Sequence, residues 1–313
     1  MLKRRDFIKR IGSGIAVSLT ACASTQDSLQ QTTENDGQDN DNQKPIPAPH
    51  SPITNLEIVP VKPMVHVSPQ PHVQTNSMEK IKNFNKDFQD DLFLEPNKIK
   101  LLQNTAYKLT LIKNHVGYGH FNLISFDDAI RYCRSLSRTT PFTKVELDFL
   151  DEIFYFNATN YGFKGDKILT RLTDTIQKKE TVKVPATGHY LFAGEAHDLY
   201  LKIRKELGSS IILTSGIRGI VKQMHLFLIK ALKVNANMSR ASRSLAPPGH
   251  SYHAIGDFDV GKKGLGASNF SSRFAATEEY KKLKRSGYVS IRYTEDNPFG
   301  VRYEPWHIKV VKS

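Results

Sequence analysis

Two histidines, several carboxylates and an arginine in the last hundred residues are of the types that build a hydrolytic zinc site. The segment His253-Ala-Ile-Gly-Asp-Phe-Asp259 is followed near the C-terminus by Glu304-Pro-Trp-His307. A catalytic zinc keeps three protein ligands, such as imidazoles and a carboxylate, and leaves its fourth position to water. A nearby carboxylate must then move the proton of that water, and Glu304 is the candidate. These residues predict an enzyme.

The flanking sequence predicts a small antiparallel sheet that carries these motifs. The predicted strands span residues 210–214, 252–260, 288–293 and 301–311. A helix is expected between the first two strands, over residues 218–232, because its apolar residues recur with a helical period. A second helix is expected over residues 271–285. The candidate histidines would then lie on two of the strands.

The preceding segment, residues 79–208, is predicted to be mainly helical. Residues 126–137 and the apolar stretch around Val145–Phe154 each indicate a helix. Lone Cys133 is expected to be a buried thiol, since no paired base is evident. Residues 183–192 form either an extended loop that lines a cleft or a turn before the next helix. Helices followed by an antiparallel sheet predict an α+β fold.

Composition limits the class of protein. The 313 residues are 39% hydrophobic and 24% charged, as in ordinary soluble domains, and no internal segment approaches 18 apolar residues. The net charge of +13 favours polyanionic surroundings such as nucleic acid, anionic lipid or an acidic cell-wall polymer. Nucleic-acid-binding signatures are missing, so we expect no nucleic-acid partner. Two cysteines exclude a disulfide framework.

The N-terminal sequence predicts a targeting signal that is not part of the fold. Lys3-Arg4-Arg5-Asp6-Phe7-Ile8-Lys9 resembles a twin-arginine export signal, and Leu19-Thr20-Ala21-Cys22 resembles a bacterial lipobox. Cys22 would be lipidated and become the mature N-terminus, which predicts a lipoprotein anchored in a membrane of the cell envelope. By analogy, Ala23 in place of aspartate favours the outer membrane, with the protein facing the periplasm. Residues 1–22 are therefore a signal, and the polar residues 23–78 a disordered tether.

Three sequence blocks, in order, resemble the M15 family of zinc metallopeptidases, which contains D-alanyl-D-alanine carboxypeptidases. Ser215-Gly-Ile-Arg218 is similar to the family's Ser-Gly-Tyr-Arg element, and Ser251-Tyr-His253-Ala-Ile-Gly256 to its Ser-x-His-x-x-Gly segment. Glu304-Pro-Trp-His307 matches the closing Glu-x-Trp-His motif. Each block alone is weak, but the ordered set over about 100 residues is specific.

The resemblance implies a role for each matching residue. His253 and His307 would bind Zn²⁺, and Glu304 would be the general base. Arg218 would neutralise negative charge on the scissile carbonyl oxygen. Ser251 would hold the motif loop or a substrate carboxylate. The resemblance also implies the fold that D,D-peptidases share with the hedgehog signalling domain, here residues 209–313, preceded by a helical subdomain over residues 79–208.

One spacing departs from the family. The family places its aspartate ligand seven residues after the first histidine, whereas Asp259 follows His253 by six residues and Asp257 by four. Asp259 is preferred because Asp259-Val260 reproduces the usual aspartate–aliphatic ending. Asp257 would then face the substrate or orient a ligand. The pair His250 and Asp257 has the seven-residue spacing but lacks the flanking serine and glycine.

The sequence therefore predicts a zinc-dependent carboxypeptidase that removes a terminal D-alanine from peptidoglycan stem peptides. Two alternatives stay open: a non-catalytic peptidoglycan-binding lipoprotein with a vestigial peptidase fold, and an endopeptidase that cleaves cross-links. The sequence does not distinguish D,D from L,D specificity.

Overall fold

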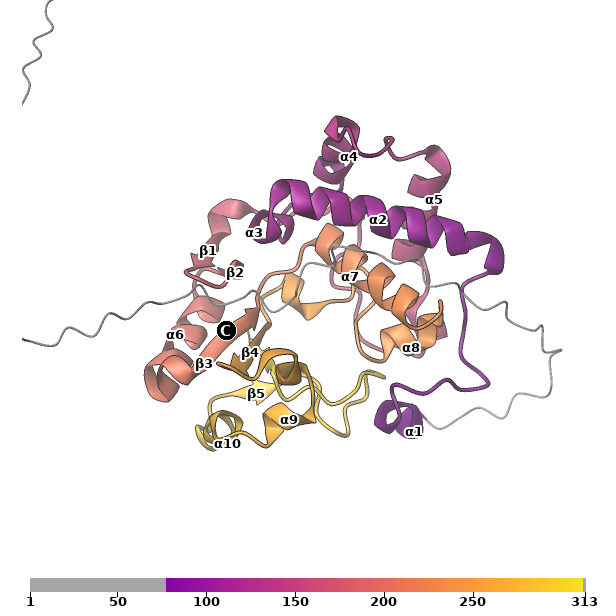
Figure 1. Cartoon of the computed structure of the whole chain (residues 1–313). Coiled ribbons are helices and arrows are strands. Elements are labelled where there is room, and N and C mark those ends of the chain that lie inside the picture. The colour runs from indigo at the N-terminus through magenta and orange to yellow at the C-terminus, as the bar shows by residue number, and fades with distance from the viewer. Residues whose placement is uncertain (1–76, 312–313) are drawn as a thin grey trace, which may run out of the picture. The chain divides into compact units, whose positions relative to one another are not determined.

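Helices of the N-terminal half and a sheet of the C-terminal half meet in the described part of the chain (Figure 1). The computed structural model describes residues 77–311. The predicted signal, Cys22 and the tether up to residue 76 lie outside these residues. The last two residues of the predicted tether begin the short helix α1 (Ser77–Lys82). The fold is α+β, with helices ahead of small antiparallel sheets, as predicted.

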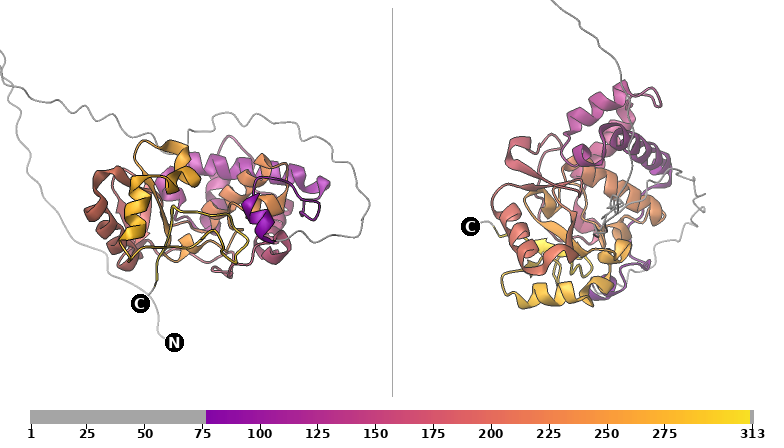
Figure 2. Two further views of the ribbon diagram at one scale, coloured as in Figure 1. Left: turned by 90° about the horizontal axis from the view of Figure 1, so that it is seen from below. Right: turned by 60° about the vertical axis from the view of Figure 1, so that its left-hand side comes forward.

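The helical part is built around α2 (Ile99–Val116), which contacts α4 (Phe126–Ser135), α5 (Lys144–Tyr155) and α7 (Ile220–Lys233). Helices α4 and α5 both begin with a capping box, in which a Ser or Thr hydroxyl and an acidic side chain satisfy backbone N–H groups. Figure 2 shows α2 beside α7 from two further directions.

One hydrophobic core crosses the predicted boundary at residues 208/209. Leu102 and Phe154 from the first segment and Phe227 and Met238 from the second are fully buried in the same cluster. The packing thus joins the predicted helical subdomain and the predicted peptidase core. Their division into two domains stays a prediction. The remaining short helices of this part are α3 (Tyr118–Phe121) and α8 (Met238–Ser242).

The larger sheet has four antiparallel strands in the order β3-β4-β6-β5. Its strands are β3 (Ile211–Ser215), β4 (Phe258–Lys262), β6 (His307–Lys309) and β5 (Ser290–Ile291). A second buried cluster unites the sheet with α6 (Glu195–Leu207), α9 (Ser272–Ala275) and α10 (Glu278–Arg285). Trp306 lies in this cluster, 2% exposed, and thus anchors the strand that begins at His307.

Several predicted elements differ from the structure. The predicted strand 252–260 is wrong in its first half, where Tyr252–Ala254 is a 3-10 helix and the strand begins only at Phe258. Gly256, with φ of +133°, makes the bend between them. The predicted helix 271–285 is two helices, because Thr277 caps the start of the second. Residues 183–192 contain most of a hairpin of β1 (Thr181–Val184) and β2 (His189–Phe192).

Two further features of the described residues bear on the predictions. Cys133 is a free, fully buried thiol, as predicted, and it donates to the Thr140 carbonyl oxygen at 3.6 Å. Burial raises its pKa, so it stays a thiol at neutral pH. Between residues 77 and 311, none of the helices combines the length and apolarity needed to cross a membrane.

Candidate metal centre

The register of the larger sheet brings three site residues into one row. Asp259 on β4 is paired with Ser215 at the end of β3 and with His307 at the start of β6. Directly paired residues of neighbouring strands have Cβ atoms about 4.5–5.5 Å apart. Two motifs that are almost fifty residues apart in sequence therefore meet because their strands pair.

His253 reaches the row from the 3-10 helix that precedes β4. Its ring lies beside that of His307, with centroids 4.7 Å apart. Its Nδ1 lies 2.8 Å from the carbonyl oxygen of Gly216, which fixes the ring. Gly216 must be glycine here, because an added Cβ would lie 2.1 Å from the Tyr190 carbonyl oxygen. The Ser-Gly-Ile-Arg block thus orients a histidine that lies far away in sequence.

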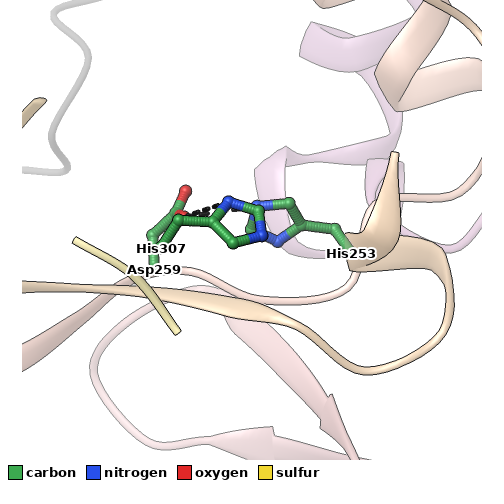
Figure 3. Close-up of side chains that lie close together, drawn as sticks. All are labelled: His253, Asp259 and His307. Carbon is green, nitrogen blue, oxygen red and sulfur yellow. Dashed lines mark ion pairs between the residues drawn. The ribbon is translucent and has the colours of Figure 1, made fainter. Parts of the chain in front are cut away.

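The three candidate ligands converge on one point (Figure 3). His253 Nε2 and His307 Nδ1 each lie 3.3 Å from Asp259 Oδ1. One potential ligand atom from each residue lies within 4.8 Å of the other two. Ligands on a tetrahedral zinc with bonds of about 2.0–2.2 Å are about 3.3–3.6 Å apart. The two nitrogen–oxygen spacings therefore fit a zinc ion.

Hydrogen bonds behind the histidines leave lone pairs facing this point. Because a carbonyl oxygen only accepts, His253 donates from Nδ1 to Gly216, and its Nε2 carries a lone pair in the neutral ring. That Nε2 and Asp259 Oδ1 are buried and have no hydrogen-bond partner. Two buried acceptors that face each other without a donor are costly unless a cation lies between them. The donor set therefore passes the test for a metal site.

Asp257 lies behind His307 and not in the cavity. His307 Nε2 donates to Asp257 Oδ2 at 3.0 Å, and Arg292 donates to both carboxylate oxygens at 2.6 and 3.0 Å. The backbone N–H of Val310 donates to Oδ1 at 2.9 Å. Asp257 does not line the cavity, so of its two predicted roles this position fits the orientation of a ligand better than contact with a substrate. His250 is not part of the candidate metal centre. Its Nδ1 lies 3.0 Å from the Asp166 carbonyl oxygen.

The ionisation states suit metal binding. Burial alone would raise the pKa of Asp259, but His253 and Arg218 hold it well below its usual value. Burial would also raise the pKa of Asp257, but hydrogen bonds from His307 and Arg292 lower it to about 2. Burial lowers the pKa of His253. Both carboxylates are therefore ionised and His253 is neutral at pH 7.

His307 shows that the centre attracts positive charge. Burial by itself would lower the pKa of His307, but its hydrogen bond to Asp257 and the nearby carboxylates of Asp259 and Glu304 raise it well above the ordinary value. A divalent cation would take over this role and displace the proton from Nδ1.

A cavity of about 180 Å³ adjoins the centre, and the other predicted site residues line it. Glu304 Oε2 lies 3.6 Å from His307 Nδ1, and the residue is 8% exposed. Arg218 donates from Nε to Ser215 Oγ at 2.8 Å and pairs with Asp259 Oδ2 at 2.5 Å. Ser251, 5% exposed, lies in the same wall. A nucleophile in this cavity would meet the candidate base and the candidate oxyanion partner together.

Sequence reasoning missed three residues of this region. Arg292 holds Asp257, Lys222 and Tyr118 line the cavity, and none of them belongs to a motif. For Lys222 a signal did exist, because a lysine stands one turn after the motif arginine, in the first turn of a helix whose buried residues are mostly apolar. Arg292 carried no signal, since its role depends on the pairing of β5 with β6.

Among residues 77–311, the remaining histidines do not join the centre. His225 is buried, with Nε2 2.9 Å from Thr110 Oγ1. His189 is buried beside Tyr118, with Nε2 3.4 Å from the Tyr118 hydroxyl oxygen. Burial, with the positive charges of Lys222 and Arg218, lowers the pKa of His189 to about 3, so it stays neutral.

The role of Asp257 yields a first testable prediction. Asp257→Asn should weaken zinc binding about tenfold to a hundredfold, because partners that orient metal-ligating histidines have effects of this size. The dissociation constant can be measured by competition with a chelating dye. The matched control is Asp151→Asn on the exposed face of α5. Equal zinc affinity in the wild type and Asp257→Asn would contradict the orienting role.

The C-terminal part of the chain is similar to a known peptidase family. Residues 193–313 match the sequence profile of the family described as VanY, D-alanyl-D-alanine carboxypeptidase. The match begins upstream of the predicted boundary at 209 and includes α6. A comparison with curated proteins found no match.

Solved structures with local similarity include three carboxypeptidase or pentapeptidase structures. The structure of the LdcB LD-carboxypeptidase is 24% identical at a TM-score of 0.35, and the match covers 39% of this chain and 59% of that one. VanYB in complex with D-alanine-D-alanine is 23% identical at a TM-score of 0.35, covering 42% and 77%. A zinc complex of a vancomycin-resistance D,D-pentapeptidase VanY variant is 22% identical at a TM-score of 0.35, covering 42% and 79%.

Proposed function

We propose that this protein is a zinc-dependent carboxypeptidase that removes the terminal D-alanine from peptidoglycan stem peptides. The family match over residues 193–313 supports the reaction class. The observation that carries the proposal is the convergence of His253 Nε2, Asp259 Oδ1 and His307 Nδ1 beside a cavity that also contains Glu304. Structural histidines and carboxylates do not usually leave buried acceptors facing one another.

The residues of the centre have separate tasks in hydrolysis. Zinc, when bound by His253, Asp259 and His307, supplies Lewis acidity for the attack of water on the substrate carbonyl. Glu304 accepts a proton from the attacking water at a carboxylate oxygen and returns it to the amide nitrogen as the C–N bond breaks. The products are the shortened peptide and free D-alanine, so atoms and protons balance.

Arg218 has donors left for the reaction. Its guanidinium carries five N–H groups, and its Nε and one terminal nitrogen contact Ser215 and Asp259. The remaining N–H groups are available to the carbonyl oxygen as it gains negative charge. Because two partners fix the guanidinium beforehand, it does not have to reorganise during the reaction. Ser251 is placed in the cavity wall to hold either the motif loop or a substrate group.

The non-catalytic alternative loses its main support. That alternative depended on the shorter spacing between His253 and its aspartate. Asp259 Oδ1 nevertheless lies 3.3 Å from the ligand nitrogens of both histidines, so the missing residue does not remove the carboxylate from the centre. We therefore propose catalysis rather than wall binding alone.

Digestion of purified sacculi tests the proposed function and its alternatives. The protein should release free D-alanine from pentapeptide-rich sacculi, and a chelator should abolish the release because the nucleophile then lacks its Lewis acid. Mass spectrometry of the muropeptides measures the result. Conversion of cross-linked dimers to monomers would instead indicate the endopeptidase. Unchanged muropeptides with zinc present would contradict catalysis.

We also propose that the domain works at the bacterial envelope, anchored through a lipid at Cys22. This proposal depends on the twin-arginine and lipobox resemblances of residues 1–22, which lie outside the described residues. A Cys22→Ser variant that leaves the membrane fraction would support it, and unchanged fractionation would contradict it.

A further inference from the structure

The cavity wall contains a buried lysine without an anionic partner. Lys222 lies in the first turn of α7 and is 5% exposed. Its ammonium lies over the ring of Tyr118, 4.4 Å from the centroid, and 5.9 Å from the centroid of Phe121. Within residues 77–311 it makes no ion pair and no hydrogen bond. Aromatic faces are its only partners there.

This arrangement differs from that of another buried lysine in the same protein. Lys108 is also 5% exposed, and its ammonium lies 2.7 Å from Glu146 and donates to the Pro141 carbonyl oxygen at 2.9 Å. Lys108 thus follows the rule that buried charges are paired. Lys222 does not follow it, because cation–π contacts replace only part of the lost hydration.

The charges around Lys222 make the absence of a partner more costly. Burial, and then the positive charges of Arg218 and Lys113, lower the pKa of Lys222 to about 7. Asp259 pairs with Arg218, and Glu304 lies beside Arg302 and His307, so neither carboxylate of the cavity pairs with the ammonium. The structure thus keeps an unpaired cation on the wall of its cavity, next to the residue assigned to the scissile carbonyl.

We propose that Lys222 binds the α-carboxylate of the residue that leaves, and so selects substrates with a free carboxylate there. The inference rests on the proposed function. That carboxylate is one residue beyond the scissile bond, a span of at most about 3.6 Å per residue. Lys222 follows Arg218 by four positions, and both line the same cavity. A substrate that contacts Arg218 through its carbonyl oxygen therefore has its terminal carboxylate in the cavity that Lys222 lines.

Peptide binding in a Glu304→Gln background tests this role without turnover. We expect a peptide ending in D-alanyl-D-alanine to bind about tenfold to a hundredfold more tightly than its C-terminal amide, the range for hydrogen bonds to charged groups. Lys222→Met should weaken binding of the acid by a similar factor and leave the amide unchanged. Lys222→Arg should keep most of the preference. Isothermal titration calorimetry measures all three.

Lys113→Met is the matched control. Lys113 also contributes positive charge near Lys222, but it does not line the cavity. Its removal should leave the preference for the acid intact. If Lys113→Met and Lys222→Met lost this preference equally, the preference would come from long-range charge, and the proposal would be overturned. Equal binding of acid and amide by the parent would also overturn it. Acid preference without hydrolysis of sacculi by the wild type would instead contradict the proposed function and leave the Lys222 assignment standing.

Thermal unfolding gives a readout that a structural lysine would not share. Lys222→Met should raise the melting temperature of the peptide-free protein, because methionine keeps the contacts with Tyr118 and Phe121 and removes an unpaired buried charge. A lower melting temperature would show that the ammonium stabilises the fold, and would overturn the assignment to substrate.

Discussion

Glu304→Gln should abolish most hydrolysis while the protein keeps its zinc. Glutamine has nearly the same shape as glutamate but cannot accept the proton of the attacking water. A general base contributes about 10²- to 10⁴-fold to the rate. Glu304 is suited to this task because it is nearly buried beside the metal centre, with Oε2 3.6 Å from His307 Nδ1. The measurement is kcat for a peptide ending in D-alanyl-D-alanine, beside the zinc content of each protein.

The control for this prediction is Glu295→Gln, which removes an exposed carboxylate close in sequence. It should retain both activity and zinc. If Glu304→Gln kept more than a tenth of the wild-type kcat, the assignment of Glu304 as the base would be wrong. Loss of zinc in Glu304→Gln would show instead that the carboxylate helps to hold the metal.

His307→Ala should lose zinc, activity and the stabilisation that zinc provides. The substitution removes one of three candidate ligands. Asp259 Oδ1 then no longer has the Nδ1 of His307 beside it. It also leaves Asp257 without its imidazole partner, although Arg292 still pairs with that carboxylate. Zinc that binds only the folded state stabilises it by mass action, by about 2.7 kcal/mol at a hundredfold excess over Kd. A chelator should therefore lower the melting temperature of the wild type but not that of His307→Ala.

His115→Ala serves as the control, because His115 is exposed on α2. Its melting temperature should respond to the chelator as the wild type does. A chelator response of the same size in His307→Ala would mean that the metal binds elsewhere or not through this ring.

The sequence sufficed to select the three candidate ligands that converge in the structure, because each motif encodes local geometry. Glu304 and His307 are three residues apart at the start of a strand, and Ser215 to Arg218 end another. Strand pairing then joins Ser215, Asp259 and His307 in one row. The preference for Asp259 over Asp257 agrees with the register, since Asp259 pairs directly with His307.

The sequence could not show which residues stand behind the ligands. His253 was expected on a strand, but alternation cannot reveal the bend at Gly256 that puts it on a 3-10 helix instead. Asp257 and Arg292 meet through tertiary packing, thirty-five residues apart. Whether Asp257 faces the cavity or the back of His307 depends on that packing and not on spacing.

In the helical half of the chain, too, the sequence predicted local structure but not tertiary packing. Apolar periodicity predicted α4 and α5, because this signal is local. That α2 and α7 would share one core did not follow from either helix alone, since each carries an apolar face that fits many partners. The position of Lys222 on a cavity wall, with Tyr118 from α3 beneath its ammonium, depends on this packing.

Zinc content tests most directly whether His253, Asp259 and His307 hold one metal ion. Inductively coupled plasma mass spectrometry of zinc-loaded, dialysed protein should find one zinc per chain in the wild type. It should find almost none in His253→Ala and His307→Ala. Comparable zinc in these variants and the wild type, or none in the wild type, would contradict the metal centre and with it the hydrolytic mechanism.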